Sequence, residues 1–93
     1  MDHTYRNDTL TIQLSNDFNW LAVQQIEPLA DDATHIRIDL SGARLLDTEA
    51  LILIDRLQRS GKTVRLIDPP DLLYDLIDLL DLAPTLDADT LVE

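Results

Sequence analysis

Three short segments in which apolar residues alternate with polar ones set the strongest limit on what this chain can fold into. They are residues 9–14 (TLTIQL), 35–40 (HIRIDL) and 63–68 (TVRLID). A period of two residues is the pattern of a strand with one buried face. The segments between them carry apolar residues at the helical period instead. Strands that alternate with helices predict an α/β domain whose later strands are parallel.

The segment after the first strand predicts a helix. One side of it is formed by residues at helical spacing, which are Phe18, Leu21, Ala22, Gln25, Ile26 and Leu29. Asn16 or Asp17 is a suitable N-cap, because either side chain can accept hydrogen bonds from the free N–H groups of a first turn. Pro28 should end this helix or bend its last turn.

A second helix is expected to begin at Asp47, a good N-cap, and to end before Gly61, where a left-handed C-cap belongs. On its exposed side, Asp55 and Arg59 are spaced to form an ion pair. The apolar stripe that faces the core is formed by Ala50, Leu53, Ile54 and Leu57.

Both ends of the chain carry weaker signals. Residues 3–5 (HTY) and the turn-prone RND predict a short strand antiparallel to the first alternating segment. Asp68 is expected to cap a third helix with Pro69 in its first turn. The buried stripe of that helix is Leu73, Leu76, Ile77 and Leu80. Residues 84–93 predict a short final turn or helix. From its length, the whole chain, residues 1–93, is expected to form a single domain, and the order of its elements predicts a mixed sheet.

The charge of the chain limits its partners. Seven Lys and Arg residues stand against 18 Asp and Glu residues, a formal net charge of −11. This field repels a phosphate backbone and an anionic membrane surface, so nucleic-acid binding is not expected. No apolar run approaches the roughly 20 residues that span a bilayer, and the start MDHTYRND has no signal-peptide pattern. We therefore expect a cytoplasmic protein without direct membrane insertion.

The residue types needed for common catalytic or metal sites are missing or scattered. There is no cysteine, His3 and His35 lack a second ligand nearby, and no Gly-x-Ser-x-Gly or Gly-rich phosphate loop is present. Four acidic residues have helical spacing and predict a solvated helix face rather than a calcium loop: Asp71, Asp75, Asp78 and Asp81. We therefore expect no enzyme, no cofactor and no metal.

Two apolar side chains fall outside the predicted buried stripes. On a helical wheel, Trp20 points away from the apolar side of the first helix, and Ile52 points away from the stripe of the second. Each is either an isolated surface residue or a contact with a partner protein, since exposed aromatic and large apolar residues often anchor interfaces. The sequence leaves both interpretations open.

Residues 36–70 (IRIDLSGARLLDTEALILIDRLQRSGKTVRLIDPP) resemble the central part of STAS domains, the family that includes anti-sigma factor antagonists. The family pattern is a strand ending in Asp-Leu-Ser-Gly, here residues 39–42, then Asp-Ser/Thr-Ser/Thr-Gly opening a helix, here residues 47–50. A Gly-Lys or Gly-Arg turn follows, here residues 61–62. The resemblance implies a sheet of about four strands with helices packed on one face, and a protein-binding module rather than an enzyme.

The sequence departs from this pattern at its central residue. In the resembling antagonists, a partner kinase phosphorylates the second hydroxyl residue of the motif, and that position is Glu49 here, with Ala50 in place of the glycine. Glu49 either complements the helix dipole, for about 0.3–1 kcal/mol, or mimics the phosphorylated state, or belongs to a lineage with constitutive binding. Constitutive binding is the preferred hypothesis. Thr48 remains an alternative acceptor.

The predicted function is a regulatory module that docks on a partner kinase or ATPase, in the first place an anti-sigma factor that is a serine kinase. The alternative is an accessory subunit that binds the ATPase of an ABC-type phospholipid transporter, as a second STAS subgroup does. The predicted docking edge consists of Asp47, Thr48, Glu49, Ala50, Leu51, Ile52 and Asp55. Apolar contacts from Ile52 or Leu51 supply affinity and a basic rim on the partner supplies complementarity. A homodimer and a bound small molecule stay open.

Overall fold

One sheet with strand order β1-β2-β3-β4-β5 forms a layer of the computed structural model, which describes residues 1–71, 73, 75, 91 and 92. The strands are β1 (Asp2–Arg6), β2 (Thr9–Gln13), β3 (His35–Asp39), β4 (Thr63–Ile67) and β5 (Leu91–Val92). β1 is antiparallel to β2, and all the other neighbouring pairs are parallel. The sheet is therefore mixed, as predicted.

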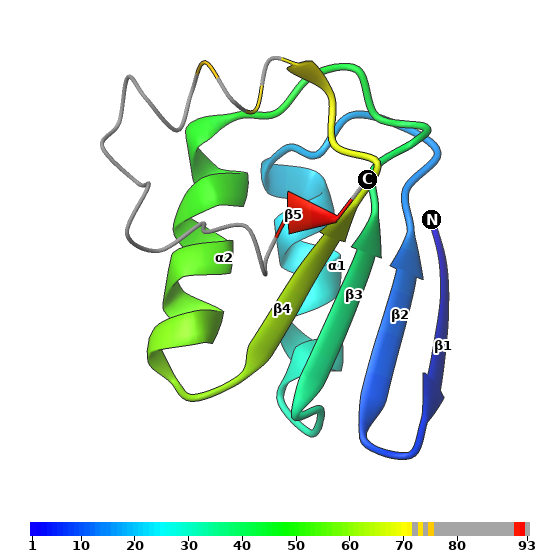
Figure 1. Ribbon diagram of the computed structural model, residues 1–93, viewed down its shortest axis with the longest axis vertical. Coiled ribbons are helices and arrows are strands. Elements are labelled where there is room, and N and C mark those ends of the chain that lie inside the picture. Colours follow the sequence, from blue (N-terminus) through cyan, green and yellow to red (C-terminus); the bar gives the residue numbers. More distant parts are fainter. Residues whose placement is uncertain (72, 74, 76–90, 93) are drawn as a thin grey trace.

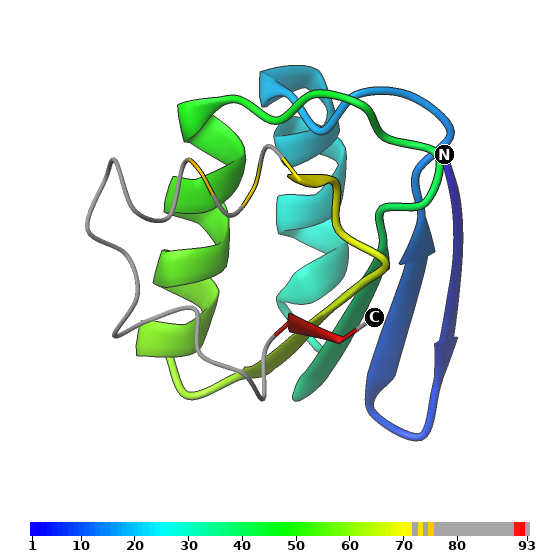
Figure 2. The same ribbon diagram turned by 45° about the horizontal axis from the view of Figure 1, so that its top comes forward.

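Two helices, α1 (Trp20–Ala30) and α2 (Thr48–Arg59), form a second layer. α1 connects β2 to β3 and α2 connects β3 to β4, and both connections step in the same direction along the sheet. Right-handed crossovers in one direction place their helices on one face of the sheet. Figures 1 and 2 show both helices on that face, so the predicted α/β fold is confirmed.

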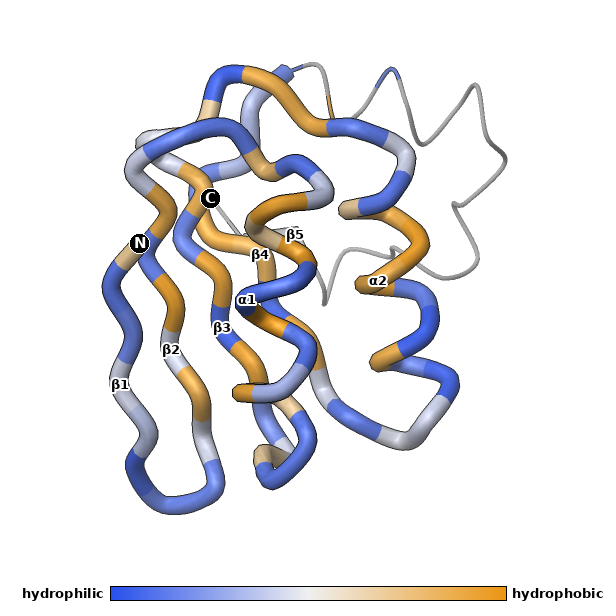
Figure 3. Tube along the Cα trace, turned by 180° about the vertical axis from the view of Figure 1, so that it is seen from behind, coloured by the Kyte–Doolittle hydropathy of each residue, from blue (hydrophilic) through white to orange (hydrophobic). Residues whose placement is uncertain are grey.

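The alternating residues of the strands divide the sheet into a covered face and an open face. In β3, Ile36 and Ile38 are buried, and in β4 Val64 and Leu66 are buried, all facing the helices. The residues between them point the other way. Seen from behind in Figure 3, the strands alternate between hydrophobic and hydrophilic colours, with α1 lying in front of them. The core therefore lies between the sheet and the two helices.

The predicted N-terminal hairpin is confirmed. A two-residue loop, Asn7 and Asp8, joins β1 to β2, and both residues have positive φ, 51° and 64°. Two successive positive φ angles fit the right-handed twist of a tight hairpin, and Asn and Asp tolerate them best after glycine. Every residue of β1 is exposed, so this edge strand adds nothing to the core.

The predicted C-cap of α2 is also confirmed. Gly61 has φ 95°, and its N–H donates to the Gln58 carbonyl at 3.1 Å. The Lys62 N–H donates to the Leu57 carbonyl at 3.2 Å, which completes a Schellman motif. The Lys62 Nζ then reaches the Ala33 carbonyl at 2.6 Å and fixes the end of α2 near the start of β3.

Two predictions for the C-terminal part are wrong. Asp71, Leu73 and Asp75 are helical, but helical conformation begins at Asp71, so Asp68 is not the N-cap and Pro69 precedes the first turn. The remainder of the expected third helix lies outside the described residues. Leu91–Val92 forms a fifth strand parallel to β4, where a turn or helix was expected.

Candidate functional site

The starts of both helices gather at one edge of the sheet. β2, β3 and β4 run in the same direction, so the loops that follow them meet at their carboxyl ends, the edge at the top of Figure 1. Backbone bonds join two of these loops: the Phe18 N–H donates to the Leu45 carbonyl at 3.0 Å, and the Asp47 N–H donates to the Phe18 carbonyl at 3.2 Å. Phe18 is fully buried beneath them. In α/β sheets this edge is where binding sites form most often.

Asp47 accepts a hydrogen bond at the start of each helix with a single carboxylate, as the N-cap of α2 and as a second acceptor beside Asn19 at α1. Its Oδ1 accepts from the Ala50 N–H at 3.0 Å in the first turn of α2. Its Oδ2 accepts from the Trp20 N–H at 3.0 Å, at the first residue of α1. The sequence predicted the first bond and not the second, because 27 residues separate Asp47 from Trp20. The carboxylate therefore fixes the two helix starts relative to each other.

Replacing Asp47 with alanine should lower the free energy of unfolding by about 2 kcal/mol, since each lost N-cap costs about 1 kcal/mol. Asn19→Ala, which removes the cap of α1 alone, should cost about half as much. Urea denaturation of the two variants and the parent protein measures both losses. Equal losses in the two variants would contradict the double-cap role of Asp47.

The cap of α1 is Asn19, not the predicted Asn16 or Asp17. The Asn19 side chain accepts from the Leu21 N–H at 3.1 Å and from the Ala22 N–H at 3.3 Å. Asp17 instead accepts from the Leu45 N–H at 3.2 Å and so belongs to the loop contact. The helix begins later than predicted because Phe18 is extended and paired with Leu46. As expected, Pro28 lies near the end of α1, which stops at Ala30.

Of the predicted docking residues, Thr48, Glu49 and Ile52 are exposed on the first turns of α2. Glu49 is in the first turn, where a negative charge complements the helix dipole. Asp55 is paired with Arg59, Oδ2 to Nε at 2.8 Å, as the spacing predicted.

Leu51 is 1% exposed and Ala50 is fully buried, so the prediction that Leu51 contacts a partner is wrong. α2 packs against both α1 and β4. Its buried face is consequently wider than the stripe that sequence periodicity gives, and Leu51 falls within it. Of the two apolar contacts considered, only Ile52 is available at the surface.

Exposed apolar side chains concentrate at this edge. Six large hydrophobic residues are exposed among the described part of the chain, and four of them lie at the helix starts or in the loop before α2. We call these four, together with Thr48 and Glu49, the helix-start surface. The four are Trp20 (52% exposed), Leu21 (51%), Leu45 (57%) and Ile52 (48%). Sequence analysis singled out Trp20 and Ile52 and did not consider Leu45. Its placement of Leu21 on the buried side of α1 is wrong, because the start of the helix lies at the open edge.

The Asp-Leu-Ser-Gly segment begins at the last residue of β3 and packs against the loop after β2 at this edge. The Asp39 Oδ1 accepts from the Ser41 N–H at 2.9 Å, and this backbone hydrogen bond lowers the pKa of Asp39 below its usual value. Gly42 then passes so close to the loop after β2 that an added Cβ would lie 2.4 Å from the Leu14 carbonyl oxygen. The glycine of this segment is therefore required for the close packing of the loops after β2 and β3.

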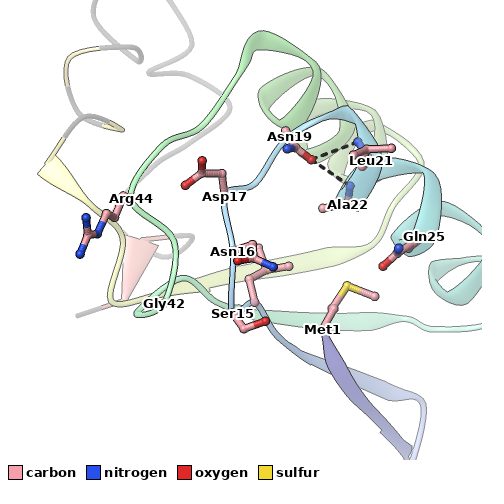
Figure 4. Close-up of a pocket in the computed structure, with 11 residues that line it drawn as sticks. Met1, Ser15, Asn16, Asp17, Asn19, Leu21, Ala22, Gln25, Gly42 and Arg44 are labelled. Carbon is pink, nitrogen blue, oxygen red and sulfur yellow. Dashed lines mark hydrogen bonds between the residues drawn. The ribbon is translucent and has the colours of Figure 1, made fainter.

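A cavity of about 600 Å³ lies beside the helix-start surface, between the start of α1 and the loops after β2 and β3 (Figure 4). Its lining is mostly polar, and Leu21 is shared with the helix-start surface. The lining residues are Met1, Leu14, Ser15, Asn16, Asp17, Asn19, Leu21, Ala22, Gln25, Gly42 and Arg44. Neither histidine lines this cavity, so it does not assemble a serine, a histidine and a carboxylate.

His35 lies elsewhere, at the start of β3 on the open face. Its Nδ1 is 3.0 Å from the Thr34 hydroxyl, and the small cavity beside it contains no serine and no carboxylate. Within the described residues no three His, Asp or Glu side chains gather as a metal site would require. In the same part of the chain, no helix has both the length and the apolar character to cross a membrane.

Comparisons with known proteins bear on the fold. No protein-family model matches the sequence, and no curated protein matches it. Solved structures do match. The crystal structure of a sulfate transporter family protein from Wolinella succinogenes has a TM-score of 0.72 and 10% identity, over 96% of this chain and 80% of that chain. The anti-sigma factor antagonist SpoIIAA in its unphosphorylated form has a TM-score of 0.62 and 16% identity, over 82% of this chain and 78% of that chain.

These likenesses agree with the mixed sheet and the two helices described above. They extend over most of both compared chains. At these identities the likeness establishes the fold. The chain has the STAS fold, which it shares with an anti-sigma factor antagonist.

Proposed function

We propose that this protein is a non-catalytic, cytoplasmic regulatory module that binds a partner ATPase or kinase through the helix-start surface. The exposure of Trp20, Leu21, Leu45 and Ile52 at one edge carries this proposal. Clustered exposed apolar side chains mark interaction sites more often than single ones do. Tryptophan is among the residue types that most often anchor binding energy, and Trp20 is half exposed on this surface.

The base beneath these anchors is rigid, which favours binding. Asp47 holds the two helix starts together, and the Phe18 backbone is bonded to the loop before α2. A surface presented by fixed helix starts loses little conformational entropy when a partner binds. The affinity per exposed side chain is therefore larger than it would be on a mobile loop.

Glu49 gives the surface a permanent negative charge. It is exposed in the first turn of α2, at the position that a kinase phosphorylates in the resembling antagonists. Because it has no hydroxyl, binding through this surface is constitutive rather than switched at Glu49. A carboxylate also has less charge than a phosphate, so it resembles the phosphorylated state only in part. The neighbouring Thr48 is exposed and is the alternative acceptor.

The first partner class is the serine kinase of an anti-sigma factor, because SpoIIAA shares the fold. The second is the ATPase subunit of an ABC-type transporter. The absence of a hydroxyl at Glu49 favours the second, since a subunit that only holds an ATPase in its active form needs no phosphoswitch. Both partners dock on the same surface in this proposal, and a basic rim on either would complement Glu49.

Affinity capture from the native cells, with the tagged protein as bait and quantitative mass spectrometry as readout, tests the proposal. Ile52→Asp and Glu49→Arg should each reduce recovery of the specific partner. For Ile52→Asp the loss of affinity should reach at least about 30-fold, the effect expected for an interface anchor. Thr4→Asp, which places the same charge on an exposed position of β1 away from the helix starts, is the matched control and should retain the partner.

The identity of the captured protein separates the two candidate functions. A serine kinase with its ATP-binding domain would support partner switching, and an ABC-type ATPase would support the transporter role. If Ile52→Asp and Glu49→Arg bind the partner as well as the parent protein does, the helix-start surface is not the docking site.

A further inference from the structure

The few basic residues of this acidic chain are not distributed evenly. Seven Lys and Arg residues stand against 18 acidic ones. Arg56 pairs with Glu27, Arg59 pairs with Asp55, and the Lys62 Nζ donates to backbone carbonyls. No residue in the described part of the chain pairs with the remaining four, which are Arg6, Arg37, Arg44 and Arg65. Three of these four lie on strands.

Arg37 and Arg65 stand side by side on the open face of the sheet. They are directly opposite each other in the register of β3 and β4. Their neighbours in sequence, Ile36, Ile38 and Val64, are buried beneath the helices, so the two arginines point to the helix-free side. Neighbouring strands lie about 4.8 Å apart, which brings the two side chains within reach of one ligand.

This arrangement is electrostatically unfavourable when nothing occupies it. Like charges directly opposite each other on one face of a sheet destabilise it. Asp39 is the acid nearest in sequence on the same face, but its Oδ1 accepts from the Ser41 N–H, and no ion pair joins it to either arginine in the described structure. Asp2 is on β1, two strands away from Asp39, with Gln13 of β2 between them. Among the described residues of this acidic chain, no carboxylate pairs with either of these two adjacent guanidinium groups.

A cavity of about 210 Å³ lies at this pair of arginines. Its polar lining consists of groups that can donate to an anion and contains no carboxylate. The lining residues are Thr9, His35, Ile36, Arg37, Thr63 and Arg65. The register places Thr9, His35 and Thr63 in one row, directly beside the arginine row. The volume is below the roughly 300 Å³ at which pockets for organic ligands begin, so it suits a single oxyanion group.

We propose that Arg37 and Arg65 bind an oxyanion of the phosphate class on the open face, with the Thr9 and Thr63 hydroxyls as further donors. Guanidinium groups match the spacing of phosphate oxygens and bind them through paired, charge-assisted hydrogen bonds. The group is either free inorganic phosphate or the phosphate of a small phosphomonoester. This site is separate from the helix-start surface, and either can fail without the other.

Titration of the ¹⁵N-labelled protein with inorganic phosphate at constant ionic strength tests the site by NMR. We expect saturable chemical-shift changes at residues 35–37 and 63–65. The affinity for phosphate should be weaker by about tenfold or more in Arg37→Gln and in Arg65→Gln, because each variant loses a charge-assisted hydrogen bond. Arg44→Gln, which removes an unpaired arginine outside this cavity, is the matched control and should bind phosphate normally. Sodium chloride in place of phosphate should give no saturable shift.

Glycerol 3-phosphate and a hexaglutamate peptide complete the test. Tighter binding of glycerol 3-phosphate than of inorganic phosphate would identify the ligand as a phosphomonoester. Equal or weaker binding would identify it as free inorganic phosphate. Phosphate shifts that do not saturate, or that persist in both the Arg37 and Arg65 variants, would overturn the proposal. Tight binding of hexaglutamate without phosphate binding would overturn it in favour of an acidic protein partner.

The unliganded proteins give a second readout. Without phosphate, Arg37→Gln should have a higher melting temperature than the parent protein, because one of two opposed charges is gone. Added phosphate should raise the melting temperature of the parent protein and not that of Arg37→Gln. The repulsion between the two arginines would be contradicted by two results together. Without phosphate, Arg37→Gln would melt at a lower temperature than the parent protein, and added phosphate would raise the melting temperature of Arg37→Gln but not that of the parent.

Discussion

Phe18→Ala should lower the free energy of unfolding by about 3–5 kcal/mol, the usual cost of removing a buried phenylalanine side chain. Phe18 is fully buried, and its backbone is bonded to Leu45 and Asp47 on both sides. Those bonds hold the loop after β2 in place, so the cavity left by the side chain cannot easily collapse. A loss this large is a major part of the stability of a small domain.

Differential scanning calorimetry measures this effect as a fall in melting temperature of at least about 12 °C, at about 4 °C or more per kcal/mol for a domain of this size. Phe18→Leu keeps most of the buried volume and should lose much less. Leu21→Ala, at an exposed site on the same edge, should change the melting temperature little. A loss for Phe18→Ala no larger than that for Leu21→Ala would contradict the packing described.

Gly42→Ala should cost about 3 kcal/mol, at the upper end of what overpacking usually costs. The added Cβ would lie 2.4 Å from the Leu14 carbonyl oxygen and 3.3 Å from the Ser15 Cα. Both are backbone atoms, so no side-chain rotation relieves the contact. The Leu14 N–H is also bonded to the Asp39 carbonyl at 3.1 Å, which resists movement of this loop away from β3.

Gly61→Ala is the matched control for Gly42→Ala. A Cβ at Gly61 would meet no atom within 4 Å, but φ is 95°, so the cost is conformational alone. A left-handed conformation costs a non-glycine residue about 1–2 kcal/mol. Urea denaturation should therefore rank Gly42→Ala as the more destabilised variant, and the opposite rank would show that the loop after β2 can yield.

The strands and the second helix could be predicted because their signals are local. Ile36 and Ile38 alternate with exposed residues, and Asp47 is followed three residues later by the N–H that it accepts from. Each of these patterns lies within one element. The Asp-Leu-Ser-Gly segment extended the prediction to the fold through its resemblance to STAS domains. The structure adds that Gly42 of this segment packs closely against the loop after β2.

The features that sequence analysis missed depend on contacts between distant residues. Asn16, Asp17 and Asn19 are all good caps, and the choice of Asn19 depends on the pairing of Phe18 with Leu46. The pairing of β5 with β4 likewise joins segments far apart in the chain, and residues 91–92 are too few to show a period.

The candidate site was predicted in part for the same reason. The exposure of Ile52 follows from its position on a helical wheel, and the structure confirms it. The burial of Leu51 depends on α2 packing against both α1 and β4, which periodicity within one helix does not reveal. Arg37 and Arg65 each look like ordinary solvent-facing strand residues, and only the register of β3 and β4 brings them together.

Hydrogen exchange of the complex with the captured ATPase, measured by mass spectrometry against the free protein, tests the central claim most directly. The account predicts slower exchange at residues 45–55 and 19–22, which contain the helix-start surface, and unchanged exchange at residues 35–39 and 63–67. Slower exchange at 35–39 and 63–67, with none at 45–55, would contradict it and place the partner on the open face of the sheet.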